Sequence, residues 1–501
     1  MRQARHILFL VFSLSITLSI PAVAQYHFTY NDTAKEIYKD IIDLKLSSAD
    51  YKLQQAIADE PENLSYLHLS SYRDFFLLFI TEDERLLKDA QKRHEKYRKQ
   101  LEKHLDDNDP YKRFAIAEIL LHTGIIHSKF DQMFRSARKV LSAYELLKEN
   151  DILFPEFIYN KKSLSVIHSL AETVSMPPLV KRIFGIEGSL LQGLTEIEEV
   201  VMQSQQDSSF LFKEEIDAIY LYIQMYQANQ PSAALAYLSE ARLDPATSPL
   251  SCFLVAKMQQ RGGLNDEAIS TLSNRPYDKA HEPFHYLDLM EGTCRLRCLD
   301  TTGIRHISSY VEKFEGRHFI KEAYQKLAWA SLVFDGDILA YKYYISQAKE
   351  KGHALVDDDK QAMSESEKAS IPDPILLKAR LLSDGGYHEK AYTLLAQKAY
   401  LFTDGNLKSL EFNYRMGRIS DALKNYPDAL DYYTTTIEQG KDLPPYFACN
   451  AALKAGLILE SLNRKDRAAA YFQQCLSMNP EEYKSSLHQK AKTAMMRLEG
   501  L

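Results

Sequence analysis

The sequence predicts an all-α fold in which pairs of helices stack side by side into an α-solenoid. Turn-forming residues are scarce, with 18 Gly and 17 Pro among 501 residues, whereas the two together average about 12% of residues in proteins. A fixed spacing of small and aromatic residues also recurs towards the C-terminus, as it does in repeat proteins. Hydrophobic residues, at 45%, can fill a large core, and the net charge of -7 argues against a nucleic-acid-binding protein, which is usually basic.

Residues 1–24 have the features of an export signal. Arg2 and Arg5 precede an uncharged run from Ile7 to Ile20, and a small-x-small triplet ends at Ala24. This pattern predicts a signal peptide that is cleaved between Ala24 and Gln25, and the run is shorter than the roughly 20 residues that span a bilayer. The residue directly after the cleavage site is Gln25 and not Cys, so a lipid anchor is not expected. We expect a periplasmic or secreted chain with no integral membrane span; a retained N-terminal anchor is the alternative.

Residues 25–214 are expected to form an N-terminal helical domain of irregular, non-repeating architecture. Polar separators that contain Pro61, Pro110 and Pro155 carry helix stop signals. The expected helices lie at 32–58, 62–80, 82–105, 110–128, 130–148 and 160–174.

Two segments near the C-terminus share one pattern of small and aromatic residues. Each has a Gly, an Ala twelve residues later and an aromatic residue four residues after the Ala. The second copy is offset from the first by 39 positions. The residues are Gly417, Ala429 and Tyr433 in the first copy, and Gly456, Ala468 and Phe472 in the second. This pattern resembles the tetratricopeptide repeat. The resemblance implies that a small residue in the first helix of each pair meets a small residue in the second, and that the aromatic ring fills the gap beside them.

Weaker copies of the pattern precede these two. Gly262-Gly263, Asp335-Gly336 and Gly385-Gly386 are expected to be turns between paired helices. The repeat phase starts the first helix of three pairs at a proline, a residue that is favoured in the first turn of a helix: Pro249, Pro283 and Pro372.

The phase sets the extent of the array. We expect tetratricopeptide-like repeats over residues 215–480, interrupted by a solvated polar insertion at 352–370, and a C-terminal capping helix at 481–501, because arrays need a polar outer end. The N-terminal half, with Ala117-Glu118-Ile119, Pro155 and Phe157, resembles that of exported bacterial tetratricopeptide proteins of unassigned function. The resemblance supplies no catalytic residues.

The five cysteines do not suggest a disulfide framework, because small exported domains held by disulfides are far richer in Cys. Cys294 and Cys298 are four residues apart, which could suggest a metal or redox pair, but packing in a helix interface is the favoured interpretation. Cys449 and Cys475 fall where the repeat pattern places small residues.

One segment matches a catalytic pattern. His281-Glu282-Pro283-Phe284-His285 fits H-E-x-x-H, in which both His lie on one face of a continuous helix and bind zinc while the Glu acts as general base. Pro283 argues against such a helix, because the residue before a proline avoids the α region. A zinc metallopeptidase is therefore a remote alternative, and we expect no metal, no cofactor and no catalytic residue.

In stacked repeats the first helix of each pair lines a concave groove that binds peptides. The repeat phase assigns six residues to this groove: Lys257, Arg380, Arg415, Arg418, Asn450 and Lys454. Five of the six are cations, and Arg can bind carboxylates through two parallel hydrogen bonds. We hypothesise that the groove binds an acidic segment of another exported or outer-membrane protein; solvated cations on helix faces are the alternative.

The sequence therefore favours a non-enzymatic exported scaffold that binds a protein or peptide partner in the cell envelope and no nucleic acid. A carbohydrate-binding helical-repeat protein is the alternative, because the chain has 31 Tyr that could stack on sugars. The one Trp, Trp329, lies within an expected helix. The sequence assigns no small-molecule ligand.

Overall fold

A computed structural model describes residues 25–173, 186–207, 209–368 and 370–499. The regular structure in these ranges is helical, and helices that follow one another in the chain pack against one another. The predicted all-α solenoid is therefore confirmed. The predicted signal peptide, including Ala24, lies outside the described residues, while Gln25 is exposed. Among the helices of the described part, none is long and apolar enough to cross a membrane.

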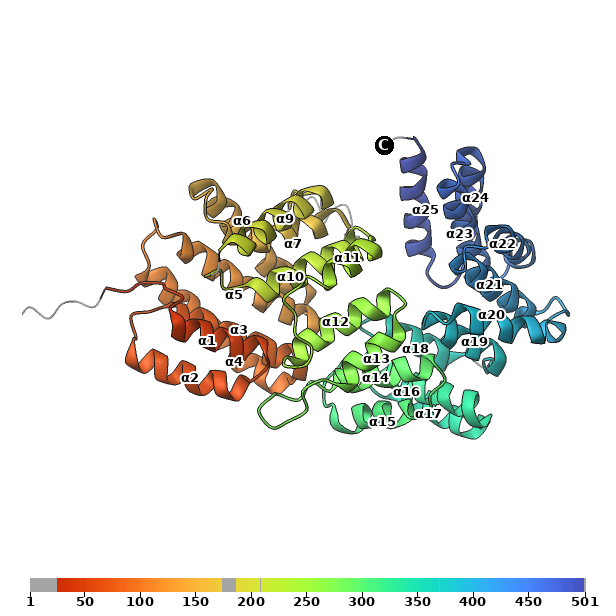
Figure 1. The fold of residues 1–501 in the computed structure, drawn as a ribbon, viewed down its shortest axis with the longest axis horizontal. Coiled ribbons are helices and arrows are strands. Elements are labelled where there is room, and N and C mark those ends of the chain that lie inside the picture. Colours follow the sequence, from red (N-terminus) through yellow and green to blue (C-terminus); the bar gives the residue numbers. More distant parts are fainter. Residues whose placement is uncertain (1–24, 174–185, 208, 369, 500–501) are drawn as a thin grey trace, which may run out of the picture.

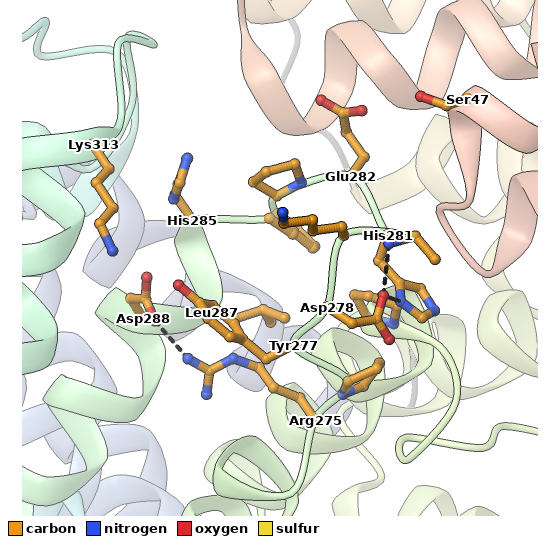
Figure 2. Close-up of a pocket in the computed structure, with 16 residues that line it drawn as sticks. Ser47, Arg275, Tyr277, Asp278, His281, Glu282, His285, Leu287, Asp288 and Lys313 are labelled. Carbon is orange, nitrogen blue, oxygen red and sulfur yellow. Dashed lines mark hydrogen bonds and ion pairs between the residues drawn. The ribbon is translucent and has the colours of Figure 1, made fainter.

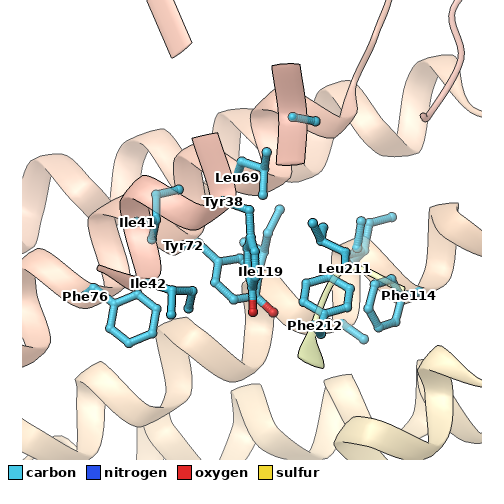
Figure 3. Close-up of a cluster of buried hydrophobic side chains, with 14 of the residues drawn as sticks. Tyr38, Ile41, Ile42, Leu69, Tyr72, Phe76, Phe114, Ile119, Leu211 and Phe212 are labelled. Carbon is cyan, nitrogen blue, oxygen red and sulfur yellow. The ribbon is translucent and has the colours of Figure 1, made fainter. Parts of the chain in front are cut away.

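The N-terminal half surrounds the largest hydrophobic core, which extends from Phe28 to Ile223 and so beyond residue 214. Figure 3 shows the rings of Tyr38, Tyr72 and Phe212 packed together in this core. Its helices are α1 (Asp32–Ile42), α2 (Leu46–Asp59), α3 (Ser65–Thr81), α4 (Glu84–His104), α5 (Pro110–Lys129), α6 (Met133–Leu153), α7 (Tyr159–Thr173), α9 (Leu190–Gln206) and α10 (Lys213–Tyr222), followed by the π-helical turn η1 (Ile223–Gln227).

A buried ion cluster ties these helices together. The Lys162 ammonium donates to Glu118 and to Glu215, each at 2.6 Å, and lies 4.5 Å from the centre of the Phe212 ring. Tyr72 also donates to Glu118, at 2.7 Å. Burial alone would raise the pKa of Glu118, but the Lys162 charge holds it well below its usual range. The buried lysine is therefore compensated within the core, as buried charges require.

The helix predicted at 32–58 is wrong, because the chain forms two helices there. Leu44 adopts a left-handed backbone conformation, with φ of 58°, between α1 and α2. Its carbonyl oxygen accepts the Glu282 N–H at 2.7 Å, and the Ile42 carbonyl accepts the Ser248 hydroxyl at 3.0 Å. The break thus exposes carbonyl groups that contacts from the array then satisfy.

The array continues from the N-terminal half as a series of paired helices. These are α11 (Pro231–Leu238), α12 (Pro249–Arg261), α13 (Asn265–Ser273), α14 (Tyr286–Arg297), α15 (Gly303–Lys313), α16 (Ile320–Ala330) with η2 (Ser331–Asp335), α17 (Ile338–Glu350), α18 (Asp357–Glu367), α19 (Pro374–Asp384), α20 (His388–Lys398) with η3 (Ala399–Leu401), α21 (Leu407–Ala422), α22 (Tyr426–Gly440), α23 (Phe447–Ser461), α24 (Lys465–Ser477) and α25 (Lys484–Glu499). Figure 1 shows a curved band, in which α12–α18 lie between the N-terminal helices and the rising stack α21–α25.

The last two predicted repeats pack as helical pairs. A Cβ atom on Gly417 of α21 would lie 2.6 Å from the Tyr433 ring of α22, and one on Gly456 of α23 would lie 2.5 Å from the Phe472 ring of α24. Ala429 and Ala468, on the second helices, are fully buried. The absence of a side chain on each glycine lets the aromatic ring reach the neighbouring helix.

The predicted helix starts are correct in one case of three. α12 begins at Pro249, but α19 begins two residues after Pro372, because the Asp373 side chain accepts the Ile375 N–H at 3.0 Å and caps the helix there. α14 begins three residues after Pro283.

The insertion predicted at 352–370 is not wholly solvated, because it forms α18, which packs on α16 and α17. Its Asp359 is fully buried, and the carboxylate accepts the N–H groups of Phe319 (2.6 Å) and Glu322 (3.0 Å) at the start of α16. Glu365 accepts the Trp329 indole N–H at 2.8 Å. Asp359 and Glu365 therefore act as a cap and a hydrogen-bond acceptor for the neighbouring helix α16.

The Glu82 carboxylate joins the N-terminal half to the array. Its oxygens accept the N–H groups of Arg317 (2.8 Å) and His318 (3.0 Å), and they lie 2.8 Å from both Lys129 Nζ and His318 Nδ1. Burial would raise the pKa of Glu82, but His318 and Lys129 outweigh it and lower the pKa to about 2.

We predict that this junction weakens in acid. Because the folded-state pKa lies below the ordinary value of 4.5, Glu82 stabilises the fold above pH 4.5, and this contribution, about 3 kcal/mol, is lost as the pH falls from 4.5 to 2. Urea unfolding across this range should show that loss in the wild type and a flatter profile in Glu82→Gln. Glu84→Gln is the control, because Glu84 pairs with Arg317 at an exposed site and should change stability little. A Glu82→Gln profile identical to the wild type would contradict the assignment.

Candidate functional site

Two glycine turns that are distant in sequence meet on the inner side of the array. The turn between α12 and α13 contains Gly263, and the turn between α19 and α20 contains Gly386. A Cβ atom on Gly386 would lie 2.3 Å from the Gly263 carbonyl oxygen. Beside them, the Tyr387 hydroxyl donates to Asp266 and accepts from the Asn265 amide at 3.0 Å. These contacts fix the curvature of the array at this point.

A cavity of about 490 Å³ lies beside this contact. Its walls come mainly from the first helices of four pairs, α12, α14, α19 and α21. The lining residues are Tyr226, Lys257, Gln260, Arg261, Gly262, Gly263, Arg297, Ser383, Asp384, Gly386, His388 and Arg418. We refer to it below as the basic cavity.

The charges that line the basic cavity do not balance. Among the described residues of the lining, Lys257, Arg261, Arg297 and Arg418 are cations, and Asp384 is the one carboxylate. Asp384 lies 3.4 Å from Arg418. Burial would raise the pKa of Asp384, but the surrounding arginines lower it, so it is ionised at neutral pH. The lining therefore carries an excess of about three positive charges at pH 7.

Three of the cations have no carboxylate partner. Lys257 donates to the Tyr286 hydroxyl at 3.1 Å, and no ion pair within the described part of the chain engages Lys257, Arg261 or Arg297. Burial, together with the Arg418 charge, holds the pKa of His388 below its usual value, so His388 adds no charge at pH 7. Within the described residues, Lys257, Arg261 and Arg297 therefore lack a direct ion pair, although the Glu322 carboxylate interacts electrostatically with Lys257 and Arg297, and Asp384 does so with Arg297.

The six predicted groove residues are divided by the structure. Lys257 and Arg418 line the basic cavity. Arg380 lies next to it, with its guanidinium 4.5 Å from the centre of the Trp329 ring and 3.6 Å from Asp384. Arg415 faces inward instead: it is 8% exposed and pairs with Glu411 one turn away.

The other two groove residues lie on α23. The Asn450 amide donates to the Tyr414 hydroxyl at 2.7 Å, which leaves it a packing role. Burial holds the pKa of Lys454 below its usual value; the Asp421 carboxylate opposes this shift, and the charges of Arg418, Lys490 and Arg261 add to it. Lys454 therefore extends the positive surface of the basic cavity onto α23.

Sequence reasoning missed Arg261 and Arg297. Arg261 lies four residues after Lys257 on α12, so the helical spacing that places residues i and i+4 on one face could have found it. Arg297 ends α14, where the repeat pattern is too weak to set the phase.

A second cavity, of about 550 Å³, surrounds the H-E-x-x-H segment. Figure 2 shows the side chains of His281, Glu282 and His285 spread along a loop rather than gathered around one point. His281 Nδ1 lies 2.8 Å from Asp278 and its Nε2 lies 3.2 Å from the Thr247 carbonyl oxygen. Since α14 begins only at Tyr286, the zinc-peptidase helix is not formed. Nowhere in the described residues do three His, Cys, Asp or Glu side chains come together in a way that could hold a metal ion.

We predict that Gly386→Ala opens the basic cavity. Gly386 has φ of +85°, and the added Cβ would also collide with the Gly263 carbonyl. Gly336→Ala is the matched control, because Gly336 has φ of +66° in another inter-helix turn and nothing lies within 4 Å of an added Cβ. Urea unfolding should show a cost of roughly 1–2 kcal/mol for the control and a clearly larger cost for Gly386→Ala. Equal losses of unfolding free energy in the two variants would show that the contact between the two turns does not stabilise the fold.

No model of a known protein family matches this chain, and no curated protein matches it at a significant level.

Proposed function

We propose that this protein is a non-enzymatic, exported scaffold of the tetratricopeptide type, and that it binds an acidic segment of a protein partner on its concave face. The observation that carries the proposal is the basic cavity, in which four cations face one carboxylate. Arginine is the side chain best suited to carboxylates, because its planar donors form paired hydrogen bonds. Three of the four first helices that form the cavity contribute a cation, so a chain lying across the helices meets several in turn.

The extent of the positive surface supports a segment rather than a single ion. Lys257 and Arg261 are one helical turn apart on α12, and the surface continues through Arg418 on α21 to Lys454 on α23. Extended peptides bind helical-repeat proteins across successive helices in this way.

The carbohydrate alternative receives less support. Sugars stack on exposed aromatic rings, yet Trp329 is 2% exposed and lies between the cations of Arg380 and Lys326. Tyr226 is the one aromatic side chain among the described residues that line the basic cavity. The lining is suited to charge rather than to ring stacking.

We predict that binding of an acidic peptide depends on Arg297 and Arg418. A fluorescent peptide rich in Asp and Glu should bind the wild type with an affinity that falls as salt is added. The double variant Arg297→Glu/Arg418→Glu should lose at least about tenfold in affinity, since truncating or reversing desolvated charges typically costs 2 kcal/mol or more. Fluorescence anisotropy measures both effects.

Lys441→Glu is the control for a charge reversal outside the basic cavity, because Lys441 is an exposed cation directly after α22. It should bind as the wild type does. Unchanged binding by the double variant would refute the cavity as the peptide site. Competition by pyrophosphate as strong as by the peptide would instead assign the cavity to small anions.

A further inference from the structure

Two cysteines face each other inside the last repeat. Cys449 lies on α23 and Cys475 on α24, and their Sγ atoms are 3.5 Å apart. Both side chains are at most 1% exposed. They belong to two helices that pack closely along their length, with Gly456 against the Phe472 ring further along the same pair.

The geometry suits a covalent link. A disulfide has an S–S distance of about 2.05 Å, so the two sulfurs, 3.5 Å apart, need to approach by about 1.5 Å. The repeat pattern puts a small residue at each of these positions, and this brings the two backbones close enough for their side chains to meet. Ser or Ala would pack here equally well, whereas Cys alone can be joined.

The remaining cysteines are arranged differently. The Cys252 thiol donates to the Thr271 carbonyl, the Cys294 sulfur accepts from the Gln260 amide at 2.9 Å, and the Cys298 thiol donates to the Arg295 carbonyl at 3.2 Å. Among the described cysteines, the contact between Cys449 and Cys475 is the one that brings two sulfurs together.

We propose that Cys449 and Cys475 form a disulfide that joins α23 to α24. The Cys449 thiolate attacks a small-molecule or protein disulfide and displaces one thiol; the Cys475 thiolate then attacks the mixed disulfide and displaces the second thiol. Two protein thiols are oxidised, one external disulfide is reduced to two thiols, and the two protons leave with them. The hydrogen bond from Cys475 lowers the pKa of Cys449, which fits Cys449 as the first nucleophile.

The disulfide would fix the position of α23, which forms part of the concave face, and it would also stabilise the fold. α23 carries Lys454, at the end of the positive surface, and Cys475 also contacts the Leu487 carbonyl of the terminal helix α25 at 3.9 Å. A bond between α23 and α24 closes a loop of 26 residues and restricts the unfolded chain. It therefore holds the last pair of helices, and the helix that covers it, in one arrangement.

The test is refolding of the full chain with oxidised and reduced glutathione. Free thiols are then alkylated under denaturing conditions, and the protein is digested without reduction for mass spectrometry. We expect a peptide pair linked through Cys449 and Cys475, with Cys252, Cys294 and Cys298 alkylated. Because both sulfurs are buried, the same glutathione mixture should form the link much more slowly in the folded, reduced protein. Alkylation of all five cysteines after oxidative refolding would overturn the proposal, as would a link between other cysteines.

Two variants separate the link from packing. Cys475→Ser should leave every remaining cysteine alkylated, whereas Cys298→Ser should retain the Cys449 link. In the wild type, reduction should lower the thermal unfolding temperature of the C-terminal repeats by several degrees, and Cys475→Ser should be insensitive to reductant. An equal response of the wild type and Cys475→Ser to reductant would also contradict the proposal.

Discussion

The concave face depends on the contact between two glycine turns whose neighbouring side chains, Asn265 and Tyr387, are 122 positions apart in sequence. Gly263 and Gly386 both have positive φ values, and the two backbones could not approach this closely if Gly386 carried a side chain. Their contact draws α12 and α14 towards α19 and α21, so that cations on different helices share one cavity. The cations that line the basic cavity repel one another. Without the contact between the two turns, each of them would be solvated separately. The packing of the turns must therefore offset the repulsion that the cavity creates.

The N-terminal half is joined to the array by two further contacts. Leu44 and Glu82 each interrupt a helical region with a left-handed backbone conformation, and each then binds the array: the Leu44 carbonyl accepts the Glu282 N–H, and the Glu82 carboxylate accepts the N–H groups before α16. This contact anchors the loop that contains Glu282 to the N-terminal half. The same contact explains why the H-E-x-x-H residues do not share a helix, a result that Pro283 anticipated from the sequence.

Local rules predicted the parts of the fold that local chemistry determines. Gly262-Gly263 and Gly385-Gly386 lie in turns between paired helices, and Pro249 starts a helix, because their backbone preferences act within a few residues. The break at Leu44 and the packing of α18 depend on partners such as Glu282 and Phe319 that are far away in the chain, and neither site contains Gly or Pro. Likewise, spacing placed Arg415 on the groove face, but pairing with Glu411 turned its side chain inward. Tertiary contacts decided the first two, and a pair within one helix decided the third.

The charged residues fall into two groups: those paired with an opposite charge in the core and at the junction, and those left, within the described part of the chain, without an ion pair in the basic cavity. Lys162 is compensated by Glu118 and Glu215 in the core, and Glu82 is compensated by Lys129 and His318 at the junction. A chain of net charge -7 has ample carboxylates to treat the basic cavity in the same way, and pairing there would lower the energy of the folded protein. The cavity instead keeps three cations without a carboxylate. The basic cavity thus differs from the core and the junction in leaving Lys257, Arg261 and Arg297 without an ion pair among the described residues, and this difference is what supports the proposal of an acidic partner.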